Sequence, residues 1–166
     1  MFFKRAPTPR ANSGADALRA LVDSEMQAAD QDSARIVMSV AGLLAHVAYA
    51  DRVYGDAEQA YARDALARMD GLTREGVMAI CELLRTHGRA IAAQNPQAFT
   101  RELRERTDVA LRREVLDVLV DLAAVDDELS LAETDLLRRT TSALGLTTDD
   151  YLAAQARHRE KLSVLR

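Results

Sequence analysis

Apolar residues recur along this chain at the spacing of helix faces. One stripe, whose members lie three or four residues apart, consists of Ile36, Val40, Leu43 and Val47. A second stripe with the same spacing lies 75 residues further on, at Leu111, Val115, Val118 and Leu122. Residues spaced in this way share one face of an α-helix, so each stripe predicts an amphipathic helix that packs on a core. No segment shows the strict alternation that is typical of a strand.

The correspondence between the two halves continues after each stripe. Residues 48–58 read AYADRVYGDAE, and residues 123–133 read AAVDDELSLAE. In both segments an Asp follows the apolar helix and a Glu follows that Asp by seven residues. The matching stripes and acidic turns predict an internal duplication, with repeat units of about 35–75 and 110–149.

Each unit ends with the sequence Gly-Leu-Thr, at residues 71–73 and 145–147. Glycine suits the left-handed position after a helix, and threonine suits the N-cap of the next one. A helix is therefore expected from Thr73 to about Gln94, with an interruption near Gly88. Asn95-Pro96 breaks it, and Pro96 is expected at the first position of a short helix. A first helix is expected to start near Ser13, and Asp30 and Asp32 are the two candidate N-caps of the next helix.

These elements predict an all-α fold. The expected arrangement is a single helical domain of seven to nine helices over residues 13–166, built from two duplicated helical hairpins and preceded by a flexible N-terminal tail at residues 1–12. The tail contains two prolines and three basic residues and shows no helical or strand periodicity, so it is expected to be mobile. Phe2 and Phe3 could still dock on the protein, because exposing two adjacent aromatic rings to water costs free energy.

Composition supports this fold and narrows the class of function. The 166 residues are 48% hydrophobic with only 7 Gly and 3 Pro, which permits long uninterrupted helices. A net charge of −4 argues against sequence-independent binding of nucleic acid. The single cysteine, Cys81, excludes an internal disulfide and sits among apolar residues, where a buried inert thiol is expected. The longest apolar run, 36–50, is shorter than the roughly 20 residues that span a bilayer, so no membrane span is expected.

The paired acidic turns are the candidate site, and two interpretations stay open. Every acid has a structural role available: Ser130 and Glu133 form a capping-box pattern, Asp56 is placed to cap a helix with Glu58 in its first turn, and Asp126 can accept turn N–H groups. The alternative is a hard-cation site for Ca²⁺, Mg²⁺ or Mn²⁺, which bind clustered oxygen atoms. Its candidate ligands are Asp51, Asp56, Glu58, Asp126, Asp127 and Glu133.

Other side chains add little evidence of catalysis. His46 lies about one turn before Asp51 and is expected to be half-buried, hydrogen-bonded to Asp51 or Glu58, or else a ligand beside them. His87 and His158 fall in stretches that are expected to be exposed. No Ser-His-Asp pattern, Cys-His pattern or glycine-rich phosphate loop is present. The chain is therefore not expected to be an enzyme. The alternative is a metal-dependent hydrolase, which requires the acids of the two turns to meet in one cleft.

The chain resembles the TerB-like family, which comprises tellurite-resistance proteins and the N-terminal helical domain of a DnaJ-like co-chaperone. The resemblance covers about residues 35–155. It rests on Ala48-Tyr49-Ala50-Asp51 with Glu58, on Val125-Asp126 with Glu133, and on the Leu144-Gly145-Leu146-Thr147 turn. The chain departs from the family pattern where Arg52 and Asp127 replace the glycine that usually follows each Asp, which brings the turn geometry into question.

The resemblance implies a cytoplasmic, non-enzymatic helical scaffold or interaction module. It further implies a link to tellurite or other stress responses, divalent-cation binding at the acidic turns, and a protein partner in a membrane-associated stress complex. The alternative is a divalent-cation sensor or sequestering protein, in which ion binding changes the affinity for a partner. Tyr49 and Tyr54, beside the first turn, either contribute to a partner-binding patch or pack against each other.

Overall fold

The computed structural model describes residues 13–126 and 129–165, and these form eight α-helices and no strand. The predicted N-terminal tail lies outside the described residues, as do Asp127 and Glu128. The all-α prediction is confirmed. The helices are α1 (Gly14–Glu25), α2 (Gln31–Ala48), α3 (Asp56–Ala67), α4 (Arg74–Ala92), α5 (Gln97–Arg106), α6 (Val109–Ala123), α7 (Leu131–Ala143) and α8 (Thr148–Val164).

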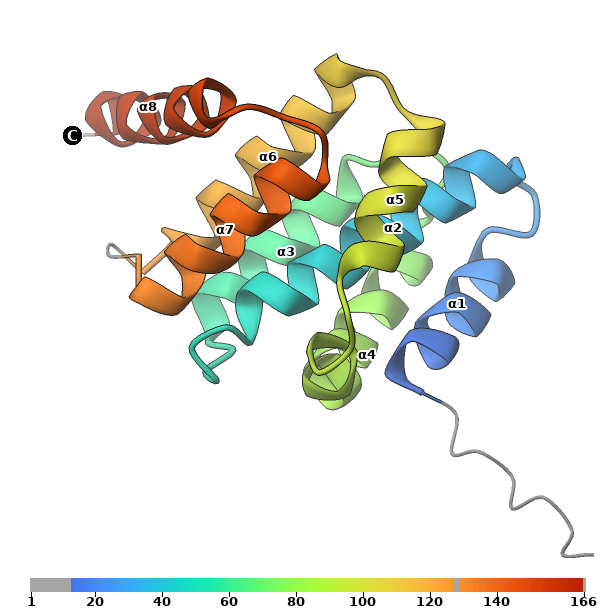
Figure 1. Ribbon diagram of the computed structural model, residues 1–166. Coiled ribbons are helices and arrows are strands. Elements are labelled where there is room, and N and C mark those ends of the chain that lie inside the picture. Colours follow the sequence, from blue (N-terminus) through green and yellow to red (C-terminus); the bar gives the residue numbers. More distant parts are fainter. Residues whose placement is uncertain (1–12, 127–128, 166) are drawn as a thin grey trace, which may run out of the picture.

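Helix α2 lies at the centre of the fold. It contacts α1, α3, α4, α5, α6 and α7, and every residue from Val37 to Ala48 is buried. Figure 1 shows it crossing the middle of the molecule, with the other helices placed around it. Its apolar sequence follows from this position, because a helix that is covered on all sides has no face left for polar residues.

The predicted helix ends are confirmed at most positions. The side chains of Ser13, Asp30, Thr73, Ser130 and Thr147 each accept a backbone N–H in the first turn of the helix that follows. The two repeat-ending glycines, at 71 and 145, adopt the left-handed conformation with φ of 85° and 70°. Local hydrogen bonds and left-handed glycines therefore mark these helix ends.

The expected interruption near Gly88 was wrong, because α4 runs through it from Arg74 to Ala92. A Cβ at Gly88 would lie 2.3 Å from a ring carbon of Tyr49. The glycine therefore serves close packing rather than a break. The Tyr49 hydroxyl donates to the Leu84 carbonyl at 2.9 Å, and the Tyr49 and Tyr54 ring centroids lie 5.2 Å apart. Of the two roles considered for these tyrosines, mutual packing is the one observed.

The two hairpins, α2–α3 and α6–α7, keep the register of the sequence repeat. Helices α2 and α6 end at Ala48 and Ala123, and α3 and α7 begin at Asp56 and Leu131, an offset of 75 in both cases. Each hairpin contacts the other, since α2 touches α6 and α7 and α3 touches α6. No helix of the described chain has both the length and the apolar content needed to cross a bilayer.

Helix α8 contacts α6, and it carries polar pairs to that helix as well as the buried Tyr151 and Ala154. Arg157 makes a bidentate ion pair with Asp117, with a shortest distance of 2.6 Å. His158 Nδ1 lies 2.7 Å from an Asp121 carboxylate oxygen, and the His158 side chain is only 15% exposed. The expectation of an exposed stretch at His158 was therefore wrong, because the contact with α6 covers it.

Candidate acidic site between the two turns

The acidic turns of the two hairpins meet at one hollow of about 260 Å³. The first turn contributes Asp51 and Glu58, and the second contributes Asp126 and Glu133. Its remaining lining residues are Ala123, Leu129 and Ser130. The packing of the hairpins thus brings four carboxylates from distant parts of the sequence to one place.

In the first turn the backbone between α2 and α3 is shaped by short polar contacts. Asp51 Oδ1 accepts the Val53 N–H at 3.0 Å, and Glu58 Oε2 accepts the Gly55 N–H at 2.8 Å. Arg52 adopts φ of 70°, the left-handed region that glycine occupies at least cost. The turn therefore keeps a glycine-type conformation although an arginine occupies that position.

The second turn contains the predicted capping box. The Ser130 N–H donates to Glu133 Oε2 at 2.7 Å, and the Glu133 N–H donates to Ser130 Oγ at 3.1 Å. Both orphan donors at the start of α7 are satisfied by this pair of hydrogen bonds. Glu58 and Glu133 thus have equivalent positions, since each reaches back to the N-cap residue three positions before it.

The two glutamates are buried, whereas the two aspartates are exposed. Glu58 is 4% exposed and Glu133 is 3% exposed, although Lys, Glu, Arg and Asp are almost never fully buried without a partner. Among the described residues, each uses only its Oε2 atom in a hydrogen bond. The floor of the hollow therefore holds two carboxylates that have little contact with solvent, beneath two that remain in it.

Burial raises the pKa of Glu58 from its ordinary value of 4.5 to about 7. The hydrogen bond from the Gly55 N–H lowers this pKa, and the negative charges of Asp51, Asp126 and Glu133 raise it. Because these three charges belong to both turns, the pKa of Glu58 reports how closely the turns approach. A positive ion in the hollow would lower the same pKa.

The remaining predicted ligands do not join this group. Asp56 is exposed, does not line the hollow, and is the first residue of α3 rather than its N-cap. Gly55 takes the N-cap position, and the Glu58 side chain supplies the capping hydrogen bond instead. The prediction for Asp56 was therefore wrong as a cap. Asp127, the sixth predicted ligand, lies outside the described residues.

His46 also lies apart from the acidic site, so its expected hydrogen bond to Asp51 or Glu58 was wrong. It is buried, and its Nδ1 and Nε2 atoms lie 2.8 Å from the carbonyl oxygens of Gly42 and Gln94. The ring packs edge-on against Phe99 of α5. The prediction failed because α2 ends at Ala48, so Asp51 lies in the turn beyond the helix and helical spacing from His46 does not place it.

The donor atoms that line the hollow suit a hard cation, but the distances between its carboxylates do not. Four carboxylates and the Ser130 hydroxyl supply only oxygen atoms, which Ca²⁺, Mg²⁺ and Mn²⁺ prefer. Within residues 13–126 and 129–165, however, no three Asp, Glu, His or Cys side chains are placed to hold an ion together. Cation binding therefore requires the carboxylates of the two turns to move closer together.

Sequence reasoning did not predict that Ala123, Leu129 and Ser130 line the hollow. Ser130 was expected only as a cap, yet it also lines the cavity, and Ala123 forms part of the wall. The sequence repeat could have identified Ala123, because Ala48 occupies the equivalent position in the other repeat unit. A small side chain at this position leaves space beside the carboxylates.

Comparison with known proteins places the chain in a family. The family model described as Tellurite resistance protein TerB matches residues 37–156, which include both hairpins and both acidic turns. The chain belongs to the TerB family. No curated protein and no solved structure matches it. The match to TerB confirms the resemblance drawn from the paired acidic turns.

Proposed function

We propose that this TerB-family protein is a non-enzymatic interaction module that binds a divalent cation between its two hairpins. The observation that carries the proposal is the convergence of Asp51, Glu58, Asp126 and Glu133 on one hollow. Helix capping does not explain this convergence, because each capping hydrogen bond is made within a single turn. Capping would be equally effective if the two turns lay far apart.

Electrostatics gives the cation a role in stability as well as in binding. Glu58 and Glu133 are buried beside each other's turns, and their charges repel when both are ionised. A divalent ion such as Ca²⁺, Mg²⁺ or Mn²⁺ relieves this repulsion and favours the ionised form of Glu58. The ion would thereby link α3 to α7, because Glu58 and Glu133 lie in the first turns of these helices.

The exposed aspartates supply the movement that binding needs. Asp51 and Asp126 are both exposed and line the hollow. A change of rotamer costs Asp51 the hydrogen bond that its Oδ1 accepts from the Val53 N–H. Asp127 remains a candidate ligand from its place in the sequence. The ion would order the mouth of the hollow, and this ordered surface is what a protein partner would recognise.

The stress-related part of the proposal is supported by the family's description as tellurite resistance. We place the protein in the cytoplasm, as a scaffold that joins a membrane-associated stress complex through a protein partner. The sensor alternative shares the same site and differs in one respect: partner affinity then changes with ion concentration. Measuring partner affinity with and without the ion separates the two roles once a partner is found.

The test is calorimetric titration of the purified chain with Ca²⁺, Mg²⁺ and Mn²⁺. We expect saturable binding of at least one ion, weakened by about tenfold or more in Asp126→Asn and in Glu133→Gln, because affinity follows the charge of the ligand set. Asp56→Asn is the control, since it removes an acid at the start of α3 that does not line the hollow. No binding at millimolar ion, or equal weakening in the control, would refute the proposal.

A metal-dependent hydrolase is the second candidate, because the acids of both turns do meet in one cleft. Such an enzyme needs an open coordination position for water. We expect no hydrolysis of p-nitrophenyl phosphate with Mn²⁺ or Mg²⁺ above the rate of the Asp126→Asn variant. Metal-dependent turnover that disappears in that variant would instead establish the hydrolase.

A further inference from the structure

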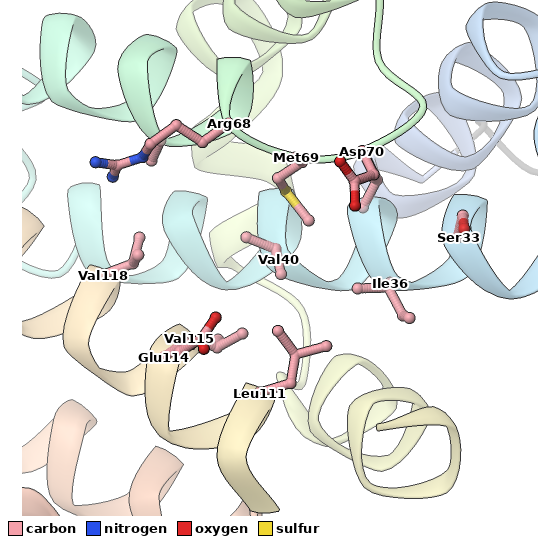
Figure 2. Close-up of a pocket in the computed structure, with 12 residues that line it drawn as sticks. Ser33, Ile36, Val40, Arg68, Met69, Asp70, Leu111, Glu114, Val115 and Val118 are labelled. Carbon is pink, nitrogen blue, oxygen red and sulfur yellow. The ribbon is translucent and has the colours of Figure 1, made fainter. Parts of the chain in front are cut away.

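A separate apolar groove lies where α2, α6 and the end of α3 come together. Its volume is about 480 Å³, within the range of pockets that take up small ligands or side chains. Figure 2 shows Met69 reaching from the end of α3 toward Val40, and Leu111 rising from α6 opposite Ile36. Nothing in the acidic site uses these residues.

The groove leaves apolar surface uncovered. Val37, Val40 and Val115 form a buried floor. Around that floor lie four apolar side chains that are only partly buried: Ile36, Met69, Leu111 and Val118. Contiguous apolar surface of this kind marks a binding site more often than scattered exposed residues do.

The rim of the groove is polar and carries more negative than positive charge. Asp70 and Glu114 stand at the rim with Arg68 and Ser33 (Figure 2). Among the described residues, neither Asp70 nor Glu114 takes part in an ion pair, whereas Asp32 nearby in the chain pairs with Arg106. An occupant of this groove should therefore combine apolar side chains with adjacent positive charge.

The chain itself contains such a segment. Phe2 and Phe3 are followed at once by Lys4 and Arg5. The only other phenylalanine of the chain, Phe99, is buried in the core. We propose that the groove is the docking site of residues 2–5 of the same chain, with Phe2 and Phe3 on the apolar floor and Lys4 and Arg5 beside Asp70 and Glu114.

The length of chain before α1 allows this contact. Helix α1 has 12 residues, so it is about 18 Å long. Its C-terminal end lies at the groove's edge, because the Met26 Cε is 3.1 Å from where a Cβ of Gly71 would be, and Gly71 follows Asp70. The ten residue-to-residue steps from Phe3 to Ser13 span up to about 33 Å when extended. The segment can thus run back along α1 and still enter the groove.

The test uses the full chain, ¹³C-labelled at Ile, Leu, Val and Met methyl groups. Replacing both aromatics in Phe2→Ser/Phe3→Ser should move the methyl resonances of Ile36, Val40 and Leu111, since ring currents from bound phenylalanines are lost. Leu162 and Val164, exposed at the end of α8, should not move. Unchanged groove methyls would overturn the proposal.

A second measurement guards against indirect effects of the aromatic substitutions. A nitroxide on Phe2→Cys, in a Cys81→Ser background, should broaden the groove methyls. The rim variant Asp70→Lys/Glu114→Lys should reduce that broadening, and the exposed Glu105→Lys on α5 should not. The remaining possible occupant is residues 2–5 of a second copy of the chain. It is tested by mixing isotope-labelled chains that carry no nitroxide with nitroxide-labelled chains that carry no isotope. Broadening in the mixture would show that a second copy supplies the segment, and would overturn docking within one chain.

Discussion

The buried Glu58 carboxyl group should make the stability of this protein depend on pH in a defined direction. The perturbation is Glu58→Gln, which removes the charge and keeps the shape of the side chain. The glutamine amide oxygen can still accept the Gly55 N–H that Glu58 Oε2 accepts at 2.8 Å. Its NH₂ group faces the hollow, where Asp51, Asp126 and Glu133 provide acceptors.

The magnitude follows from the pKa of Glu58, about 7 in the folded protein against an ordinary value of 4.5. A raised folded pKa means that the native state binds the proton more tightly than the unfolded chain does. The resulting stabilisation is full below pH 4.5 and is lost as the pH rises through 7. Each pKa unit corresponds to about 1.4 kcal/mol, so the free energy of unfolding should fall by about 1–3 kcal/mol between pH 5 and pH 8.

The assay is urea denaturation followed by circular dichroism at pH 5, 6, 7 and 8, with a chelator present to exclude cations. Glu58→Gln should match the native protein near pH 5 and exceed its stability by about 1–3 kcal/mol at pH 8. Glu105→Gln, an exposed acid on α5, serves as the control and should show no such divergence. Parallel stability curves for Glu58→Gln and the native protein would refute the reasoning about the hollow.

Two further substitutions test the turns themselves. Ser130→Ala removes the side chain that accepts the Glu133 N–H and should lower the free energy of unfolding by about 0.5–2 kcal/mol in thermal or urea denaturation; an unchanged midpoint would contradict the capping account. Arg52→Gly relieves a left-handed residue and should raise stability by roughly 0.5–1 kcal/mol, after allowance for the greater freedom of glycine in the unfolded chain. Arg52→Ala keeps the unfavourable conformation, so equal stability of the two Arg52 variants would argue against strain there.

Most of the fold could be predicted from sequence because its determinants are local. The stripes beginning at Ile36 and Leu111 identify α2 and α6, and caps such as Thr73 and Thr147 fix where helices begin. The errors arose where distant contacts decide the outcome. Gly88 looked like a helix break until the Tyr49 ring, 39 residues away in the chain, was placed against it.

The candidate site was predictable in its residues but not in its geometry. The repeated Asp and Glu spacing identified Asp51, Glu58, Asp126 and Glu133 as candidates. Whether the two turns lie together depends on how one hairpin packs on the other, and no spacing within a single turn contains that information. The same limit applies to His46, because its neighbour Gln94 follows α4 and reaches the ring only through the packing of distant segments.

The enclosure of α2 has a consequence for the history of the molecule. Thirteen of its 18 residues are buried, and much of that cover comes from α5, α6 and α7 in the other half of the chain. A half-length precursor would have left this helix open to water. If the two hairpins descend from one shorter gene, self-association of its product would have supplied the contact that α2 now makes with α6 and α7, and fusion would have placed that contact within a single chain.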